Sequence, residues 1–363
     1  MNDGLKERLR PLFQGCMLGS AIGDAFGMPV ETMTHEEIMV ATNGRGITDY
    51  VAPIQTKFKD MRDFKAGMWT DDTQLTIAVA KSLIEKRKLD MISQGEWHIV
   101  AFNEAQIGWG KTTRNSIKEI KYNLRHAEQP AENNGCGNGV AMKIAPLALF
   151  YMAKYLQKDN YYWKSSFIDI LMEDVIRLGK MTHGDIRASI AAVLVAYFII
   201  YSINSTLDND GDWRDWLDDQ FLKILEKEEA ELINSGQGID LSFFEAFKYG
   251  KVMDIILGSY IDGQAFLNTR NKFGGPFFAV ESILTVILMA EHSGHMKDEE
   301  IFENLVLKTV NFGGDADSNA AMVGAIIGAR VGINNIPAHW IENLYRRDDI
   351  IKIADDLLDA VFE

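Results

Sequence analysis

The sequence predicts an all-α protein built as one domain. Helical periodicity runs through most of the 363 residues, few segments alternate as strands do, and only 7 prolines interrupt the apolar runs. Hydrophobic residues make up 47% of the chain, which is enough to bury a large core. Neither an internal repeat nor a low-complexity tract divides the chain. We therefore expect a single domain over residues 1–363 with ten or more helices.

The first expected helix carries glycines on one face. Residues 12–27 have a glycine at every fourth position, and residues four apart share a helix face, so this face can pack very closely. The same periodicity predicts further helices, at 72–87, 97–106, 114–125, 140–156, 165–180, 186–203, 214–234, 241–259, 277–292, 298–311, 318–331 and 338–362. Polar or glycine-containing segments predict loops at 129–139, 204–215 and 268–276, and the segment 204–240 has no assigned role.

Composition excludes several classes of protein. A formal net charge of -15 would repel a phosphate backbone, so general nucleic-acid binding is not expected. The two cysteines, Cys16 and Cys136, form no CxxC pair, which fits a reducing cytoplasm. The apolar stretch 188–203 is shorter than the roughly 20 residues that a membrane span needs, so we interpret it as a buried central helix. We expect a cytoplasmic protein without a membrane association, and a monomer is favoured.

Two acidic motifs stand where helices are expected to begin. One reads Trp-Thr-Asp-Asp-Thr at 69–73, and the other reads Gly-Gly-Asp-Ala-Asp-Ser at 313–318. Together they offer six hard oxygen ligands of the kind that magnesium or manganese prefers: Thr70, Asp71, Asp72, Asp315, Asp317 and Ser318. Two such metals could activate a water and orient a substrate oxygen. The alternative is helix capping, with Thr70 or Asp71 as an N-cap, but capping explains neither the doubled aspartate nor the glycine pair.

Other residues suggest supporting roles. Asp24 lies inside an otherwise apolar helix, so we interpret it as a structural hydrogen-bond hub. Glu31 follows Pro29, where the helix is expected to break into a mobile segment. The glycine-rich loop 135–139 is a candidate anion cradle. His183, just before the long apolar helix, is more typical of a cap or a core hydrogen-bonding group than of a catalyst.

Six blocks, in order along the chain, resemble those of the ADP-ribosylglycohydrolase family, which includes the dinitrogen reductase-activating glycohydrolases. They lie at 15–31, 69–74, 108–113, 137–149, 182–192 and 311–332. The resemblance implies an all-α orthogonal helical bundle with a central binuclear site for two Mg²⁺, or Mn²⁺. It also implies that the six oxygen ligands above bind the metals, with Ser318 standing where many members have threonine.

The same resemblance assigns residues to the substrate. Glu31 matches a glutamate that some members carry on a mobile flap over the metals. Gly137, Asn138 and Gly139 match the loop that holds ADP-ribose, and His183 matches a histidine near it. The block after Gly275 matches only loosely.

The implied activity is hydrolysis of the N- or O-glycosidic bond between ADP-ribose and a modified protein side chain. Arginine is the first-choice acceptor, with serine-linked or O-acetyl substrates as alternatives. A water would attack C1″ of the distal ribose, and Glu31, Asp71 or Asp72 would manage its proton. Two other functions stay open: an ADP-ribose-binding or toxin-neutralising, immunity-type partner with secondary catalysis, and an unrelated metal-dependent hydrolase.

Overall fold

The protein is an all-α bundle, as predicted. The computed structural model describes residues 2–54, 64–104, 107–157, 165–208 and 298–363, together with residues 279, 282, 283, 285–287 and 289. Among these residues there is no strand, and one isolated bridge joins Thr34 to Gly313. The α-helices are α1 Asn2–Gly27, α2 His35–Ala41, α3 Asp71–Lys86, α4 Met91–Glu104, α5 Lys111–Lys121, α6 Ala145–Gln157, α7 Ser165–Lys180, α8 Ile186–Asp208, α15 Asp298–Phe312, α16 Ala316–Val331, α17 Ala338–Asn343 and α18 Arg347–Phe362.

Most helix positions agree with the sequence predictions, but two predictions were wrong: residues 204–208, predicted as part of a loop, belong to α8, and the helix predicted over 338–362 is interrupted. Helix α7 has the predicted bounds, whereas α4 begins six residues before the predicted start. The helix predicted over 338–362 is two helices, α17 and α18. Between them Arg346 adopts a left-handed conformation with φ 54, and the amide of Tyr345 donates to the carbonyl of Gly67 instead of continuing a helix. The helices predicted at 214–234 and 241–259, the loop at 268–276 and most of 277–292 lie outside the described residues.

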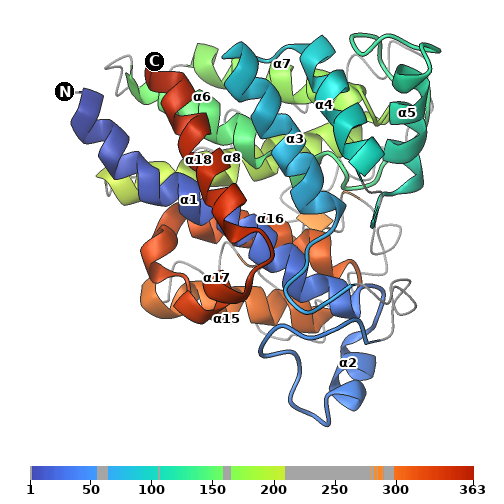
Figure 1. The fold of residues 1–363 in the computed structure, drawn as a ribbon, viewed down its shortest axis with the longest axis vertical. Coiled ribbons are helices and arrows are strands. Elements are labelled where there is room, and N and C mark those ends of the chain that lie inside the picture. The colour runs from blue at the N-terminus through green and yellow to red at the C-terminus, as the bar shows by residue number, and fades with distance from the viewer. Residues whose placement is uncertain are drawn as a thin grey trace, which may run out of the picture.

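The glycine face of α1 packs directly on α16. A Cβ added at Gly19 would lie 2.1 Å from the carbonyl oxygen of Gly324, and one at Gly23 would lie 2.0 Å from that of Ala320. The two helices therefore touch backbone to backbone and run antiparallel through the centre of the bundle (Figure 1). A Cβ at Gly27 would lie 2.3 Å from the amide nitrogen of Asp317. This packing brings the end of α1 to the second acidic motif.

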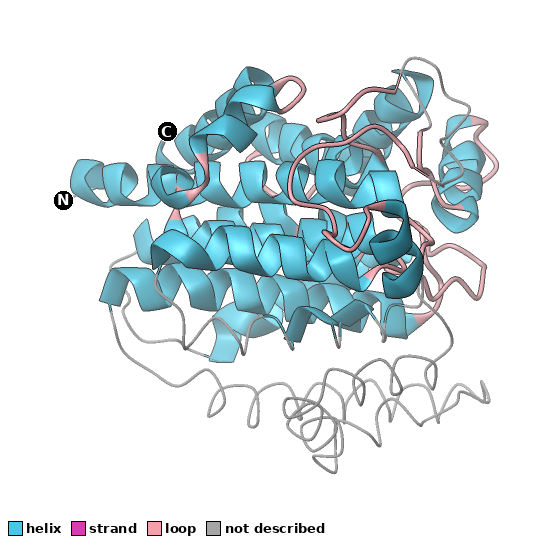
Figure 2. Cartoon of the chain, turned by 90° about the horizontal axis from the view of Figure 1, so that it is seen from below, coloured by secondary structure: helices cyan, strands magenta, loops and turns pink. Residues whose placement is uncertain are grey.

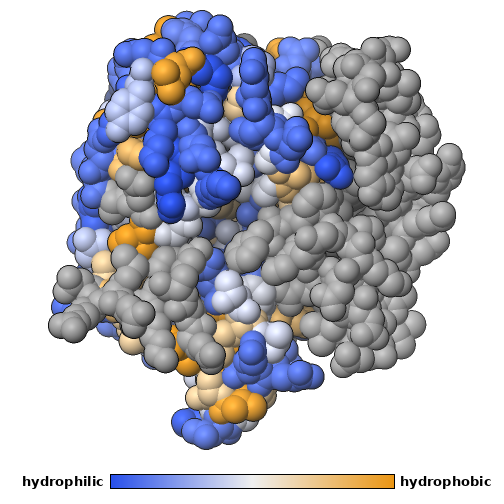
Figure 3. Space-filling model, turned by 90° about the vertical axis from the view of Figure 1, so that its right-hand side faces the viewer, coloured by the Kyte–Doolittle hydropathy of each residue, from blue (hydrophilic) through white to orange (hydrophobic). Residues whose placement is uncertain are grey.

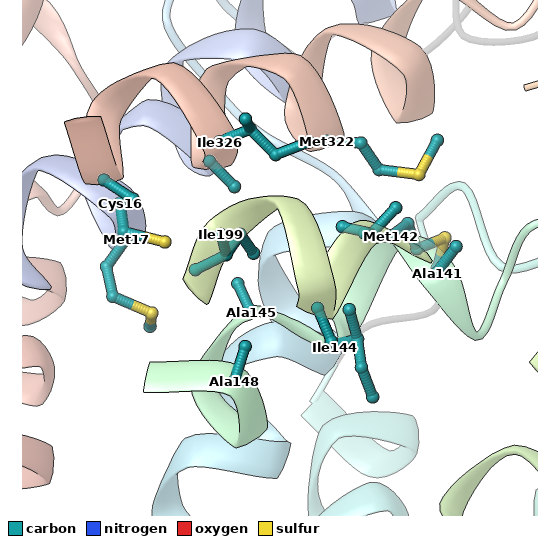
Figure 4. Packing of buried hydrophobic residues seen from close by; sticks show 14 of the residues in the cluster. Cys16, Met17, Ala141, Met142, Ile144, Ala145, Ala148, Ile199, Met322 and Ile326 are labelled. Atoms are coloured by element: carbon teal, nitrogen blue, oxygen red, sulfur yellow. The ribbon is translucent and has the colours of Figure 1, made fainter. Parts of the chain in front are cut away.

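Helix α8 forms much of the apolar core. It is the one described helix that is long and apolar enough to cross a membrane, yet 89% of that stretch is buried inside the protein. In Figure 4, Ile326 of α16 points toward Ile199 of α8, and Ala145 and Ala148 of α6 lie on the other side of Ile199. A helix enclosed in this way has no face left for lipid, so the interpretation of 188–203 as a central helix is confirmed.

The loops of the bundle gather mainly at one end. Figure 2 shows most of the described loops at the end of the bundle away from the two chain termini. Helices α3 and α16 both begin there, next to the 3-10 turn Met28–Val30 and the 3-10 turn Ala141–Lys143. Helix N-termini and loop backbones from distant parts of the sequence therefore converge at this end.

Candidate active site

A cavity of 330 Å³ brings the predicted site residues together. Both acidic motifs line it, although they lie far apart in the sequence, and so do Glu31 and the glycine loop. Of the predicted site residues, Thr70 alone is not on its wall. The cavity is lined by Glu31, Asp71, Asp72, Gly108, Gly110, Lys111, Thr112, Thr113, Gly137, Asn138, Gly139, Met142, His183, Asp315, Asp317 and Ser318.

The first acidic motif is capped by a residue from another helix. Thr70 occupies the N-cap position of α3, but its side chain makes no capping bond. Instead, the buried carboxylate of Asp24 on α1 accepts hydrogen bonds from the backbone amides of Thr70 at 2.9 Å and Thr73 at 3.0 Å. It also accepts from their hydroxyls, at 2.8 and 2.6 Å. Thr70 is therefore the N-cap residue, as predicted, but the capping bonds are made to Asp24 instead of by Thr70, and the hydrogen-bond hub predicted at Asp24 is confirmed.

This arrangement fixes the direction of the Thr70 hydroxyl. An ionised Asp24 can only accept, so the proton of the Thr70 hydroxyl points at Asp24 and the lone pairs of its oxygen point away from Asp24. Burial, and then the charge of Asp317, raise the pKa of Asp24 to about 7. The first motif is thus anchored to α1, whose glycine face is anchored to α16.

The second acidic motif follows a turn that requires glycine. Gly313 and Gly314 have φ 73 and 76, and a Cβ on Gly313 would lie 2.2 Å from the carbonyl oxygen of Met33. Asp315 then stands at the N-cap of α16, and its carboxylate accepts a short hydrogen bond from the side-chain amide of Asn138. Asn138 also donates to the hydroxyl of Ser282 at 2.9 Å. The glycine loop therefore orients an acidic residue of the site, a role that the sequence did not reveal.

Glu31 lies within the acidic cluster. Carboxylate oxygens of Glu31, Asp315 and Asp317 lie within 4.8 Å of one another, and Glu31 is only 2% exposed. The helix break predicted at Pro29 is confirmed, since α1 ends at Gly27 and is followed by the 3-10 turn and then by a turn at Glu31 and Thr32. Mobility of this segment stays a prediction, and in this structure the segment places Glu31 beside Asp315 and Asp317.

The electrostatics of the cluster fit a divalent cation. Burial first, and then neighbouring carboxylates, raise the pKa values of Asp72 and Asp315 well above the usual range. Among the described residues, the buried Oδ1 of Asp72 has no hydrogen-bond partner. Cations bound to these oxygens would offset the mutual repulsion and satisfy that oxygen, and carboxylate and hydroxyl oxygens are the ligands that hard cations prefer.

His183 lies beside the glycine loop as a neutral side chain. Its Nδ1 is 2.9 Å from the hydroxyl of Thr182, and a Cβ on Gly139 would lie 3.0 Å from its ring. Burial, and then the charge of Lys143, lower the pKa of His183 to about 3. The imidazole is therefore uncharged at neutral pH, in agreement with the prediction of a core hydrogen-bonding group.

Two residues at or near the site have features that the sequence analysis did not predict. Gly108 has φ 86, and a Cβ there would lie 2.1 Å from Oδ1 of Asp71. The glycines flanking Trp109 were a usable signal for this close approach. Lys143 is fully buried, and its ammonium nitrogen has no hydrogen-bond partner among the described residues. Burial lowers its pKa to about 7, and the nearby charge of Asp71 opposes that shift.

An all-α bundle whose acidic motifs converge on one cavity is a framework suited to an enzyme that binds divalent cations. The chain belongs to the ADP-ribosylglycohydrolase family, whose model matches residues 4–363. The predicted resemblance is thereby confirmed over nearly the whole chain.

Named relatives and a solved structure agree with this membership. The ADP-ribosyl-[dinitrogen reductase] glycohydrolase of Rhodospirillum rubrum is 24% identical over 330 residues, covering 91% of this chain and 89% of the relative. The ADP-ribosylarginine hydrolase Tri1 of Serratia proteamaculans is 24% identical over 362 residues, covering 95% and 78%. A solved ADP-ribosylglycohydrolase-related protein complex shares the fold with a TM-score of 0.63 at 20% identity, over 98% of this chain and 99% of that one.

Proposed function

We propose that this protein hydrolyses the glycosidic bond between ADP-ribose and a modified protein side chain, with arginine as the preferred acceptor. The observation that carries the proposal is the single cavity in which both acidic motifs, Glu31 and the glycine loop meet. The family membership supports hydrolysis, and the name of the Serratia relative supports arginine as the acceptor.

The proposal includes a binuclear magnesium site, with manganese as an alternative. The residues that would hold the metals are Thr70, Asp71, Asp72, Asp315, Asp317 and Ser318. When bound, such cations supply positive charge and Lewis acidity toward the oxygens of a substrate. Thr70 is included although it does not line the cavity wall. Its hydroxyl donates its proton to Asp24, so the lone pairs of the hydroxyl oxygen stay available for a metal.

Two groups of backbone amides would bind the diphosphate of ADP-ribose. One is the loop of Gly137, Asn138 and Gly139, which lines the cavity beside His183. The other is the start of α5, whose N-cap Gly110 provides no side-chain bond to the first-turn amides. Lys111 follows at the cavity wall and adds a positive charge. On the molecular face to which α5 belongs, much of the described surface is hydrophilic (Figure 3).

The protein's carboxylates would handle the proton of the attacking water. Glu31, Asp71 and Asp72 all line the cavity and are buried to 6% exposure or less, so each can hold a water at a ribose C1″ that sits among them. Positive charge that develops on the ribose during bond cleavage is stabilised by the same carboxylates. Because these carboxylates are buried, their charges are screened less by solvent than charges on the surface.

The acceptor is tested with a panel of substrates that differ only in linkage. Free ADP-ribose released from arginine-linked, serine-linked and O-acetyl-ADP-ribose substrates would be measured with Mg²⁺, with Mn²⁺ and with a chelator. We expect the fastest release from the arginine-linked substrate and none in chelator. Faster release from another linkage would contradict the acceptor while supporting the hydrolase, and tight binding of ADP-ribose without any release would support a binding protein instead.

A further inference from the structure

Asn311 makes an unusual double contact with a distant backbone. It lies in the last turn of α15, two residues before Gly313, and is half-buried. Its side-chain oxygen accepts from the amide of Ile47 at 2.7 Å, and its side-chain nitrogen donates to the carbonyl of Ile47 at 2.9 Å. The same nitrogen donates to the carbonyl of Leu307 at 2.8 Å, which fixes the rotamer. One side chain therefore satisfies both backbone groups of one residue, as a neighbouring strand would.

The backbone of Asn311 holds a second point of the same segment. Nδ1 of His35, the first residue of α2, lies 2.7 Å from the carbonyl oxygen of Asn311. The contact between Asn311 and Ile47 favours glycine at the preceding position. Gly46 has φ 70, and a Cβ there would lie 2.6 Å from the Asn311 side-chain oxygen. Residues 31–47, called here the Glu31 segment, are thus attached to Asn311 both at the start of α2 and after its end.

Next to Glu31 the segment is bonded to the turn that follows Asn311. The amide of Thr32 donates to the carbonyl of Gly314 at 2.7 Å, and the amide of Gly314 donates to the carbonyl of Met33 at 2.7 Å. Thr32 has φ 74, which is unfavourable for a β-branched residue. The backbone preference of Thr32 therefore disfavours this conformation of the Glu31 segment. The contacts of the segment with residues 311–314 stabilise the conformation instead.

We propose that Asn311 is a positioning residue that keeps Glu31 inside the acidic cluster with Asp315 and Asp317. Asn311 does not line the cavity and acts only by holding the Glu31 segment against the helix that leads into the second acidic motif. The proposal rests on the proposed function in that cations bind beside Asp315 and Asp317, and it assigns to the carboxylate of Glu31, which lies within 4.8 Å of theirs, a contribution to the affinity for those cations. It adds that the affinity of the site depends on a side chain outside the cavity.

The test compares Asn311→Ala with Asn304→Ala. Asn304 lies on the same helix and donates to the carbonyl four residues earlier at 2.7 Å, as Asn311 does at 2.8 Å. It is exposed, and among the described residues its side chain has no hydrogen bond to a distant segment. Hydrogen exchange of the amides of Thr32 and Ile47 reports attachment of the segment, and titration with Mn²⁺ alone reports the site. Loss of two bonds to Ile47 should speed exchange by about tenfold to thirtyfold and weaken Mn²⁺ binding by about tenfold, with Asn304→Ala within about twofold of wild type.

A double-mutant cycle separates positioning from a general structural effect. In a Glu31→Gln background, Asn311→Ala should cause no further loss of Mn²⁺ affinity, because the carboxylate through which it acts is gone. An equal loss in both backgrounds, or unchanged exchange in Asn311→Ala, would overturn the proposal. Asn311→Asp keeps the side-chain shape and removes both donated bonds, so it replaces the alanine variant should that fail to fold. A wild-type protein that binds no Mn²⁺ would count against the proposed function, while the exchange rates would still decide whether Asn311 holds the segment.

Discussion

The carboxylate of Asp24 accepts hydrogen bonds from both the backbone amide and the hydroxyl of Thr70. Through this contact the helix with the glycine face determines where the first acidic motif stands. Because Gly27 of the same helix lies against the backbone of Asp317, the second motif is positioned by the same element. Helix α1 is therefore the common support of the two halves of the site.

Asp24→Ala should strongly destabilise the protein. The change leaves the buried amides of Thr70 and Thr73 without acceptors, which we expect to lower the free energy of unfolding by about 3–4 kcal/mol. Chemical denaturation measures the loss. Asp90→Ala is the matched control, since Asp90 accepts only from the amide of Ser93 at the start of α4 and should cost about 1 kcal/mol. Similar losses for the two variants would contradict the role of Asp24 as a hub.

The metal-free protein should become less stable as the pH rises from 5 to 8. Burial and a neighbouring carboxylate raise the folded-state pKa of Asp24 from 3.8 to about 7, and those of Asp72 and Asp315 are raised as well. Between the unfolded and folded pKa values the folded state binds more protons than the unfolded state, so stability falls as these protons are lost. Thermal unfolding in chelator measures the effect, and Asp315→Asn should reduce it. A metal-free protein that is more stable at pH 8 than at pH 5 would show that other groups dominate.

Gly108→Ala should reduce activity while the fold persists. The added Cβ would lie 2.1 Å from Oδ1 of Asp71, and φ 86 is unfavourable for alanine, so the carboxylate must shift. We expect a loss in kcat/KM of about a hundredfold. Gly4→Ala is the control, since Gly4 does not line the cavity and its Cβ would meet nothing within 4 Å. Equal activities of the two variants would mean that Asp71 can move without consequence.

Gly23→Ala should destabilise the bundle by about 3 kcal/mol or more. Its Cβ would lie 2.0 Å from the carbonyl oxygen of Ala320, and helices in backbone contact can relieve this only by moving apart. Gly4→Ala, on the same helix, meets nothing within 4 Å and should be neutral or stabilising by about 0.5–1 kcal/mol. Unfolding free energies of the two variants test the packing, and a Gly23 variant as stable as the Gly4 variant would contradict it.

Helical periodicity and the position of single polar residues predicted most features that depend on nearby sequence alone. The bounds of α7 followed from helical periodicity, and the buried aspartate in an apolar stretch identified Asp24 as a hub. The groups that Asp24 caps could not be predicted, because they come from a different helix. The break before α18 was missed for a similar reason, since the amide of Tyr345 bonds to Gly67, far away in the sequence. Both are tertiary contacts, which helical periodicity does not reveal.

The meeting of the two acidic motifs was likewise beyond a local argument. It depends on the backbone contact between α1 and α16, for which the glycine spacing predicted a closely packing face but not its partner. The requirement for glycine at position 108 was also missed, because it arises from the adjacent carboxylate of Asp71, which comes from another part of the sequence. The resemblance to the ADP-ribosylglycohydrolase family, in contrast, implied that the two acidic motifs belong to one site.

The most direct test of the account is the release of free ADP-ribose from an arginine-ADP-ribosylated protein, with and without Mg²⁺, by the wild type and by Asp315→Ala. Asp315 is buried at the start of α16 beside Glu31 and Asp317, so its loss should remove part of the cation site. We predict release that requires Mg²⁺ and that falls at least about a hundredfold in a folded Asp315→Ala variant. Release that is independent of Mg²⁺, or full activity in the variant, would contradict the account.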